Sequence, residues 1–343
     1  MGDNVLQWFP KSGLANALRA NAMYPLHIPG HKRNPKFTLT PELCQDITEI
    51  EGFDDLHSAS GLIKETQDLA AKLYGARKSF LLVNGSSCGN LSAIRALHRP
   101  FGGTELIVIG ESHRSVLHAA ELCNLNTVTY DNARDAKICV VTSPAYNGET
   151  LDIPAIAARC HAGGIALHVD AAHGAHLGFN PYFPENATRQ GADTAVESLH
   201  KTLPALGQTS LLHVCGVNID AEEISRQLDV FETSSPSYVL MASADYCLRL
   251  LDAKGTELFD GFAERLRRFY KSVENVPFVR RYSENSDPAK IALYGESIPE
   301  LLRENLIEPE RVTPDGTILI TTICDEDFIF DKLTRLLIKE NLK

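Results

Sequence analysis

Three short segments place reactive or ligand-binding side chains directly after predicted strands, and the first is residues 84–90. Its sequence, Asn-Gly-Ser-Ser-Cys-Gly-Asn, lies between a predicted strand and a predicted helix. Small residues there let backbone N–H groups approach an anion, and the helix dipole favours negative charge. Ser86 and Ser87 would add hydroxyl donors to a phosphate. Because Gly and Ser also form ordinary helix caps and tight turns, this segment alone leaves both interpretations open.

The second segment is His168-Val169-Asp170-Ala171-Ala172-His173-Gly174-Ala175-His176, which continues an apolar, strand-like run. A carboxylate at this strand end can hold the pyridine nitrogen of pyridoxal phosphate (PLP) protonated, so that the ring accepts electrons. His168, Asp170, His173 and His176 are also competent metal ligands, but no HExxH motif or Cys-rich partner accompanies them, and we predict no metal site. An Asp that simply caps the next turn is a third interpretation.

The third segment is Ser198-Leu199-His200-Lys201-Thr202, at the end of another strand-like stretch and 31 positions after Asp170. A lysine at the carboxyl edge of a sheet can be desolvated, which frees its amine to form a Schiff base. Ser198 and His200 could reach the same phosphate. Taken alone, a lysine after a strand is more often a solvated surface residue. The order of a phosphate turn, an Asp and a Lys, each at a strand end, favours a PLP site.

Apolar runs that alternate with helical patterns predict an α/β fold with a mostly parallel sheet and crossover helices. The predicted strands are residues 79–83, 105–109, 137–142, 165–169, 194–198 and 210–214, and the predicted helices among them are 89–97 and 153–161. A smaller C-terminal α/β domain follows, with helices at 221–231, 238–252, 258–273 and 326–342 and strands near 278–281 and 317–322. We therefore divide the chain into an N-terminal segment (1–24), a large PLP-binding domain (25–216) and linking helices with the small domain (217–343).

Composition narrows the possible partners and compartment. The formal charge of −11 and the pI near 5.6 argue against a broad nucleic-acid surface, because phosphate binding needs clustered Lys and Arg. No apolar run is long enough to span a membrane, and residues 1–10 lack the pattern of a signal peptide. The eight cysteines include no CxxC pair, which favours reduced thiols. We expect a cytoplasmic protein that binds neither nucleic acid nor membrane.

Taken together, several motifs resemble the PLP-dependent Orn/Lys/Arg decarboxylase major-domain family of fold type I, which has the aspartate aminotransferase-like fold. The resemblance covers about residues 25–250 and keeps the order of the family's signatures. These motifs are Pro29-Gly30-His31-Lys32, Asp46-Ile47-Thr48-Glu49 with Asp54-Asp55-Leu56, Val83-Asn84-Gly85-Ser86, Val141-Thr142-Ser143-Pro144, Asp170 with Ala172-His173-Gly174-Ala175-His176, and Ser198-Leu199-His200-Lys201-Thr202-Leu203.

The resemblance implies a role for each candidate site residue. Lys201 would carry PLP as a Schiff base, Asp170 would pair with the pyridine nitrogen, and His113 would stack on the ring. His173 would lie beside the ring. The residues implied to hold the phosphate are Ser86, Ser87, Ser198 and His200. The segment Thr233-Ser234-Ser235-Pro236-Ser237 resembles one that reaches the neighbouring subunit's cofactor, so a homodimer with shared sites is implied.

Two departures from the family pattern limit what can be carried over. Ala171 stands where the family usually has Glu, and the chain passes from Tyr130 to Lys137 where the family commonly has a longer loop and helix. The sequence also shows neither the long carboxyl-terminal extension nor the amino-terminal wing of the large inducible decarboxylases, so we expect a dimer rather than a large ring.

The leading functional prediction is decarboxylation of lysine, ornithine or arginine to a polyamine or its precursor. Lys201 and His200 are candidates for the acid that reprotonates Cα. A carboxylate that receives the substrate's cationic side chain would come from the acidic residues Glu49, Glu51, Asp54 and Asp55, which could equally be solvated surface groups. The alternatives are another PLP reaction, such as β-elimination, aldol cleavage or transamination, and a non-catalytic PLP-binding homologue.

Overall fold

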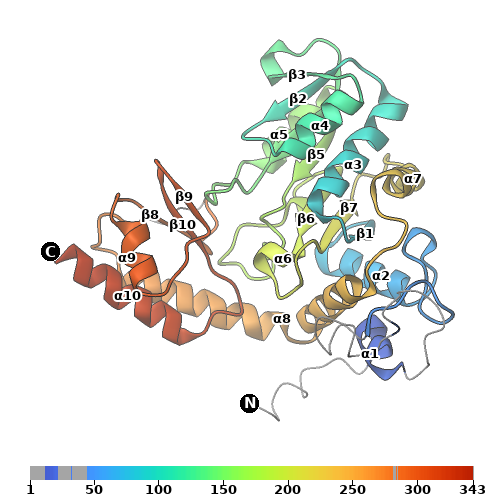
Figure 1. The fold of residues 1–343 in the computed structure, drawn as a ribbon. Helices are drawn as coiled ribbons and strands as arrows, with labels where there is room; N and C mark the ends of the chain where they lie inside the picture. Colours follow the sequence, from blue (N-terminus) through green and yellow to red (C-terminus); the bar gives the residue numbers. More distant parts are fainter. Residues whose placement is uncertain (1–11, 22–31, 33–44, 281–282, 284, 343) are drawn as a thin grey trace. The chain divides into compact units, whose positions relative to one another are not determined.

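The computed structural model describes residues 12–21, 32, 45–280, 283 and 285–342, and it divides into two compact units (Figure 1). The first comprises Met1–Thr142, Asp152–Ala175 and Asn186–Ala253, and the second Ser143–Leu151, His176–Glu185 and Lys254–Lys343. The predicted boundaries at residues 24 and 216 do not coincide with these units. A unit is defined by contacts between residues distant in sequence, which local patterns do not report. Of the Pro29-Gly30-His31-Lys32 motif, all but Lys32 lies outside the described residues.

The first unit is built on a seven-stranded sheet with the order β1-β7-β6-β5-β4-β2-β3. β7 is antiparallel to both β1 and β6, and the other neighbours are parallel, so the predicted mostly parallel α/β fold is confirmed. The strands are β1 (Lys78–Leu82), β2 (Glu105–Ile109), β3 (Asn126–Val128), β4 (Ala136–Thr142), β5 (Ala166–Asp170), β6 (Thr194–Ser198) and β7 (Ser210–Val214).

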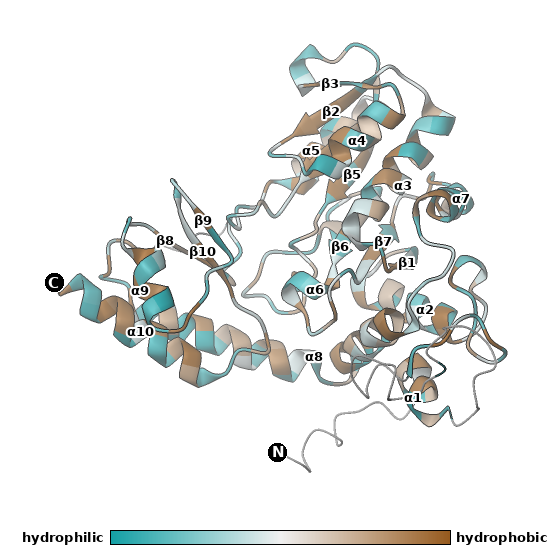
Figure 2. Ribbon diagram, in the orientation of Figure 1, coloured by the Kyte–Doolittle hydropathy of each residue, from teal (hydrophilic) through white to brown (hydrophobic). Residues whose placement is uncertain are grey.

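Apolar side chains cover both faces of this sheet. On β4, Ile138 and Val140 belong to one buried cluster, whereas Cys139 and Val141 belong to another, because successive side chains of a strand point to opposite faces. Burial on both faces explains why the strands are continuous apolar runs, and β2 is accordingly hydrophobic along most of its length in Figure 2. The helices of this unit are α1 (Gly13–Ala20), α2 (Leu62–Tyr74), α3 (Gly85–Phe101), α4 (Arg114–Leu122), α5 (Ile153–Ala162), α6 (Leu199–Thr202) and α7 (Ala221–Phe231).

The short link that the sequence predicts before β4 contains only the 3₁₀ turn η4 (Tyr130–Asn132). The preceding strand β3 was not predicted, because it has three residues and none is buried. The carboxylate of Glu105 accepts hydrogen bonds from the backbone N–H groups of Arg134 (2.6 Å) and Asp135 (2.8 Å), which holds the link against the sheet. Tyr130 is partly buried and packs against the buried cluster that contains Cys139 and Val141.

The second unit contains a three-stranded antiparallel sheet with the order β8-β10-β9 and two helices that follow α8. The predicted strand at 317–322 is β10, but near residue 279 only an isolated bridge to Leu293 forms. The strands β8 and β9 and the helix α9 were missed. The bounds are α8 (Tyr238–Ser272), β8 (Lys290–Leu293), α9 (Ile298–Glu304), β9 (Arg311–Thr313), β10 (Gly316–Ile320) and α10 (Asp327–Asn341).

The two predicted helices at 238–252 and 258–273 are wrong, because the structure has one continuous helix, α8, of 35 residues. Gly255 lies inside this helix, and a single glycine costs a helix only about 1 kcal/mol. Buried side chains on both sides of it, Leu251 and Phe259, supply packing that offsets this cost. No helix in the described part of the chain has both the length and the apolar character needed to cross a membrane.

α3 packs closely against the sheet at Gly89, and a substitution there tests this packing. A Cβ added there would lie 2.5 Å from Cγ2 of Val196 and 2.9 Å from Cδ1 of Leu82. We expect Gly89→Ala to lower the free energy of unfolding by about 1–3 kcal/mol through overpacking. Denaturant unfolding followed by circular dichroism measures the effect.

Gly261→Ala is the matched control, because Gly261 also lies in a helix but its added Cβ meets only the flexible Arg265 side chain at 3.4 Å. This change should stabilise the protein by roughly 0.5–1 kcal/mol. A Gly89→Ala protein at least as stable as the wild type would contradict the close packing.

Candidate active site

The predicted site segments come together at one edge of the large sheet. β1 runs in the same direction as β6, because both are antiparallel to β7, and β2, β5 and β6 belong to the parallel part of the sheet. The carboxyl ends of these four strands therefore share an edge, which is where open α/β sheets bind ligands. At or just beyond these ends lie residues 84–90, which include the first turn of α3, and His113, Asp170 as the last residue of β5, and Lys201.

The turn after β1 opens into α3 and has the form of a phosphate cradle. Gly85 has a φ of +74°, a conformation that glycine adopts without strain, and its N–H donates to the carbonyl of Gln208 at 2.9 Å. Asn84 is the N-cap residue of α3, but its side chain makes no capping hydrogen bond. The N–H groups of the first turn of α3 are therefore not bound by that side chain. Ser86 and Ser87 are half-buried in this turn. The donor set suits a phosphate group.

The segment predicted to reach a neighbouring subunit begins beside this turn. The N–H of Thr233 donates to Oδ1 of Asn84 at 3.2 Å, and the N–H of Val83 donates to Oε1 of Glu232 at 2.7 Å. Burial raises the pKa of Glu232 to about 7. The residues Thr233, Ser234 and Ser235 are exposed.

Asp170 is a buried carboxylate whose partners are all neutral. Its side chain accepts hydrogen bonds from Nδ2 of Asn90 at 2.9 Å and from the N–H of Ala172 at 3.2 Å. It is only 2% exposed, and no ion pair within the described residues involves it. An uncompensated buried charge is costly, and a carboxylate can accept about four hydrogen bonds. A protonated pyridine nitrogen would supply the missing cation, so the site fits PLP on this count.

Asn90 also links Asp170 to two further side chains that sequence reasoning left without a site role. Its Nδ2 donates to Oγ of Ser115 at 2.9 Å, and its Oδ1 faces Nε2 of His168 at 2.8 Å. The hydroxyl of Ser115 in turn contacts Nδ1 of His113. His113 is an exposed residue and directly precedes α4. The available signal was a polar residue on the buried face of a predicted helix, one turn before the buried Ile94.

Lys201 lies in the one-turn helix α6 after β6 and is half-buried. Its Nζ is 3.1 Å from Nε2 of His173, so the amine and an imidazole can exchange a proton. Nδ1 of His200 donates to the carbonyl of Thr209 at 2.8 Å, because a carbonyl oxygen only accepts. Ser198 is fully buried and accepts a weak hydrogen bond from Oγ of Ser210 at 3.4 Å.

The four side chains considered as metal ligands do not converge. Nδ1 of His168 contacts Thr194, and Nε2 of His176 contacts Asp287 at 3.0 Å within the second unit. Across the part of the chain that is described, no group of three or more His, Cys, Asp or Glu side chains is arranged to hold a metal.

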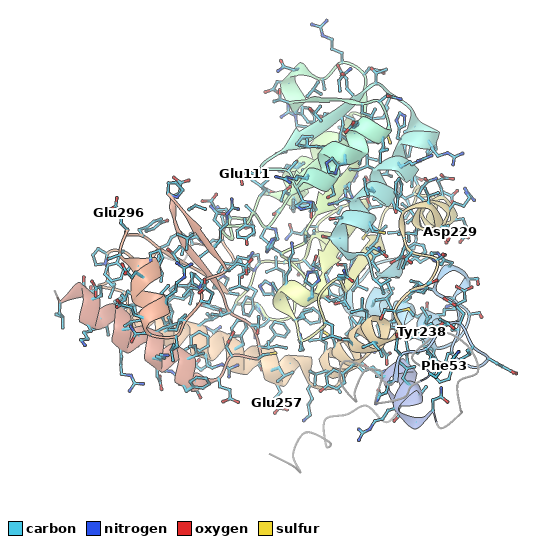
Figure 3. All side chains as sticks on the ribbon, viewed as in Figure 1. Phe53, Glu111, Asp229, Tyr238, Glu257 and Glu296 are labelled. Carbon is cyan, nitrogen blue, oxygen red and sulfur yellow. The ribbon has the colours of Figure 1, made fainter. Side chains whose placement is uncertain are left out.

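Two of the four acidic residues considered for a substrate cation serve the backbone instead. The carboxylate of Asp54 accepts hydrogen bonds from the N–H groups of residues 55, 60, 61, 63 and 64. Asp55 accepts from the N–H of His57 and from the hydroxyl of Ser58. Tyr238, labelled in Figure 3, donates to the carbonyl of Asp54 and further fixes this loop. Of the four acidic residues, Glu49 and Glu51 take no part in these loop hydrogen bonds, and both are exposed.

Comparison with solved structures shows the fold of the PLP enzymes of fold type I. The constitutive lysine decarboxylase of Escherichia coli superposes with a TM-score of 0.79 over 95% of this chain and 59% of its own, at 19% identity. A structure of SPT with PLP superposes with a TM-score of 0.63 over 80% of this chain and 75% of its own, at 15% identity.

The chain belongs to the Orn/Lys/Arg decarboxylase, major domain family, whose model matches residues 18–135 and 125–291. The predicted family is thus confirmed. It is 35% identical over 308 residues to the uncharacterized protein YaaO of Bacillus subtilis, covering 79% of this chain and 63% of that protein. It is 29% identical over 360 residues to the arginine decarboxylase of the same organism, covering 91% and 73%. The chain therefore spans somewhat under two thirds of the length of the first relative.

The buried imidazole of His168 generates a prediction about pH. Burial lowers the pKa of His168 to about 4, against 6.5 for an ordinary histidine. Between these values the unfolded chain binds a proton that the folded protein excludes, so the stability is complete above pH 6.5 and is lost as the pH falls toward 4. This loss amounts to about 3 kcal/mol.

We expect His168→Gln to make the free energy of unfolding fall less steeply with acidification, by about one bound proton over this window. Glutamine keeps an N–H donor for Asn90. Denaturant unfolding at a series of pH values compares the two slopes, and identical slopes would mean that His168 titrates normally in the folded protein.

Proposed function

We propose that this protein is a PLP-dependent decarboxylase of a basic amino acid, lysine, ornithine or arginine. Membership of the Orn/Lys/Arg decarboxylase family makes PLP its cofactor. The observation that carries the proposal is the buried carboxylate of Asp170, which has no ion pair among the described residues, at the end of β5, together with the half-buried amine of Lys201 just after the neighbouring strand β6. The names of the arginine and lysine decarboxylase relatives support the substrate class.

In this proposal each side chain of the edge has one task toward the cofactor. Lys201 holds the carbonyl carbon through its amine, and Asp170 accepts the N–H of the pyridine ring. Ser86, Ser87, Ser198 and His200 hold the phosphate, while His113 and His173 lie against the ring. Bound PLP supplies an electron-accepting ring for the bond that breaks at the substrate's Cα.

The protein's own contribution to the reaction is to hold charge and to move protons. Asp170 places its carboxylate where the cationic pyridine nitrogen would bind. The site is buried, and the attraction between opposite charges is strong in a buried setting. Lys201 is the acid that we assign to Cα, because its Nζ lies beside an imidazole that can take or return a proton. His200 is a weaker candidate, since Thr209 already engages its Nδ1.

The proposal extends to the substrate's side chain and to the assembly. Glu49 or Glu51 would receive the cationic end of the substrate, and the product would be a polyamine or its precursor. We also propose a cytoplasmic homodimer in which the segment Thr233-Ser234-Ser235-Pro236-Ser237 of one subunit reaches the cofactor of the other. The exposure of Thr233, Ser234 and Ser235 supports this arrangement.

Another PLP reaction is the alternative, because one fold serves several chemistries. Ala171 is the observation that favours it: this residue is 2% exposed beside Asp170 and carries no carboxylate. A PLP-binding homologue without turnover is the third possibility that the assay below distinguishes.

Attachment of the cofactor is tested by reduction with borohydride. Wild-type protein incubated with PLP and reduced should carry one phosphopyridoxyl group on the tryptic peptide that contains Lys201, and Lys201→Ala should carry none there. Lys254→Ala removes an exposed lysine paired with Glu257 and should label normally. Mass spectrometry of the peptides gives the result. Stoichiometric labelling of another lysine in the wild type would refute the role of Lys201.

The reaction is tested by incubating the PLP-loaded protein with lysine, ornithine and arginine in heavy water and measuring the products by mass spectrometry. We expect an amine that has lost carbon dioxide and gained one deuterium at the former Cα. Amino acids deuterated at Cα, or keto acids, would instead indicate another PLP reaction. The absence of any product would favour the non-catalytic homologue.

A further inference from the structure

Asn90 is a fully buried amide that uses all of its hydrogen-bonding groups. Its two N–H bonds reach Oδ2 of Asp170 and Oγ of Ser115, both at 2.9 Å, and its Oδ1 lies 2.8 Å from Nε2 of His168. The partners come from β5 and α4, whereas Asn90 itself belongs to α3. The amide thus links α3, α4 and β5 next to the carboxyl edge of the sheet, which carries the site.

The orientation of this amide is fixed by His168. Because Oδ1 of an amide only accepts, Nε2 of His168 must donate to it, and Nδ1 then accepts from the hydroxyl of Thr194 at 2.8 Å. His168 is buried and neutral near neutral pH, so it has one ring proton to donate. If the amide were flipped, Oδ1 would face the carboxylate of Asp170 and two acceptors would be opposed. The amide N–H groups therefore point to Asp170 and Ser115.

The same chain of hydrogen bonds sets the proton of His113. Nδ1 of His113 accepts from the N–H of Ser115 at 3.2 Å, which requires a lone pair on that nitrogen. Oγ of Ser115 lies 2.8 Å from the same Nδ1 and therefore donates to it, while it accepts from Asn90. The neutral imidazole of His113 consequently carries its proton on Nε2.

We propose that Asn90 is a positioning residue that couples two contacts of the cofactor, the carboxylate of Asp170 and the imidazole of His113. This inference rests on the proposed PLP function. Through one N–H, Asn90 fixes the direction in which Asp170 presents its oxygens. Through the other, it directs the hydroxyl of Ser115 toward Nδ1 of His113, the nitrogen that also accepts the backbone N–H of Ser115. Asp170 and His113, which would contact the pyridine nitrogen and the face of the ring, would then be unable to reorient independently of each other.

The discriminating variant is Asn90→Asp, which keeps the size of the side chain and the acceptor for His168. It replaces the donor to Asp170 and Ser115 with a second carboxylate oxygen. Loss of a hydrogen bond to a charged group, together with like-charge repulsion, should weaken PLP binding about 10- to 100-fold. The dissociation constant is measured by titrating the full-length protein with PLP and following the visible absorption band.

A second readout does not depend on the cofactor. With ¹⁵N-histidine in the full-length protein, His113 should show an N–H on Nε2 and an unprotonated Nδ1 in the wild type at neutral to slightly alkaline pH. Ser115→Ala removes the hydroxyl link but leaves the Asn90–Asp170 contact. It removes one of the two donors to Nδ1 of His113, while the backbone N–H of residue 115 still donates there, so the tautomer with its proton on Nε2 should persist with a shifted ¹⁵N resonance of Nδ1. PLP binding should weaken only a few-fold, less than in Asn90→Asp.

Ser92→Ala is the matched control, because Ser92 is a fully buried residue of the same helix and is not part of this chain of hydrogen bonds. It should leave both PLP affinity and the ¹⁵N shifts of His113 unchanged. If Asn90→Asp does not fold, Ser115→Ala still tests the coupling through the ¹⁵N shifts of His113.

The outcomes separate this inference from the proposed function. Wild-type protein that binds no PLP would remove the proposed function and the inference with it. Wild-type protein that binds PLP, with Asn90→Asp binding equally well and the ¹⁵N shifts of His113 unmoved by Ser115→Ala, would overturn the role of Asn90 alone. Weaker binding in Asn90→Asp with a shifted Nδ1 resonance of His113 in Ser115→Ala, and neither effect in Ser92→Ala, would support it.

Discussion

The buried carboxylate of Asp170 is the constraint on which the rest of the site depends. Burying a charge without a counter-charge is unfavourable, so the surroundings must stabilise it until a cationic ligand does. Two neutral donors, Asn90 and the backbone of Ala172, do this in the structure. His168 and Ser115 hold Asn90 in place, and the pairing of β5 with β6 holds the backbone at Ala172.

The sheet supplies the second requirement, which is to bring distant residues to one edge. Parallel pairing of β5 with β6 places the loops that carry His173 and Lys201 side by side, and the two side chains meet at 3.1 Å. The antiparallel insertion of β7 between β1 and β6 keeps residues 84–90 at the same edge. Asp170, Lys201 and the first turn of α3 are thus brought to one edge of the sheet, while buried apolar clusters cover both of its faces.

The residues that could be predicted from the sequence are those whose role is announced by a local pattern. Continuous apolar runs such as β4 indicate strands buried on both faces, and Asp170 and Lys201 stand out as polar residues at the ends of such runs. Three features lacked such a signal. The continuity of α8 through Gly255 depends on the burial of side chains on both sides of it, such as Leu251 and Phe259, which the local sequence does not show. β8 and β9 are short, and β8 begins with a lysine, so no alternation is visible. The contact between Asn90 and Asp170 joins residues 80 positions apart, which a single sequence does not relate.

The pairing of β1 with β7 also has a consequence for when the site is completed. Lys78 pairs with Val214, so β1 cannot take its place in the sheet until the chain has been synthesised beyond β7. The strands β2, β3 and β4, in contrast, are joined by short links and can pair soon after they leave the ribosome. Residues 84–90 come directly after β1, and Lys201 lies between β6 and β7. During biosynthesis the nascent chain would therefore acquire half of its sheet long before it could retain a cofactor, and capture of that cofactor would mark the end of the assembly of the first unit.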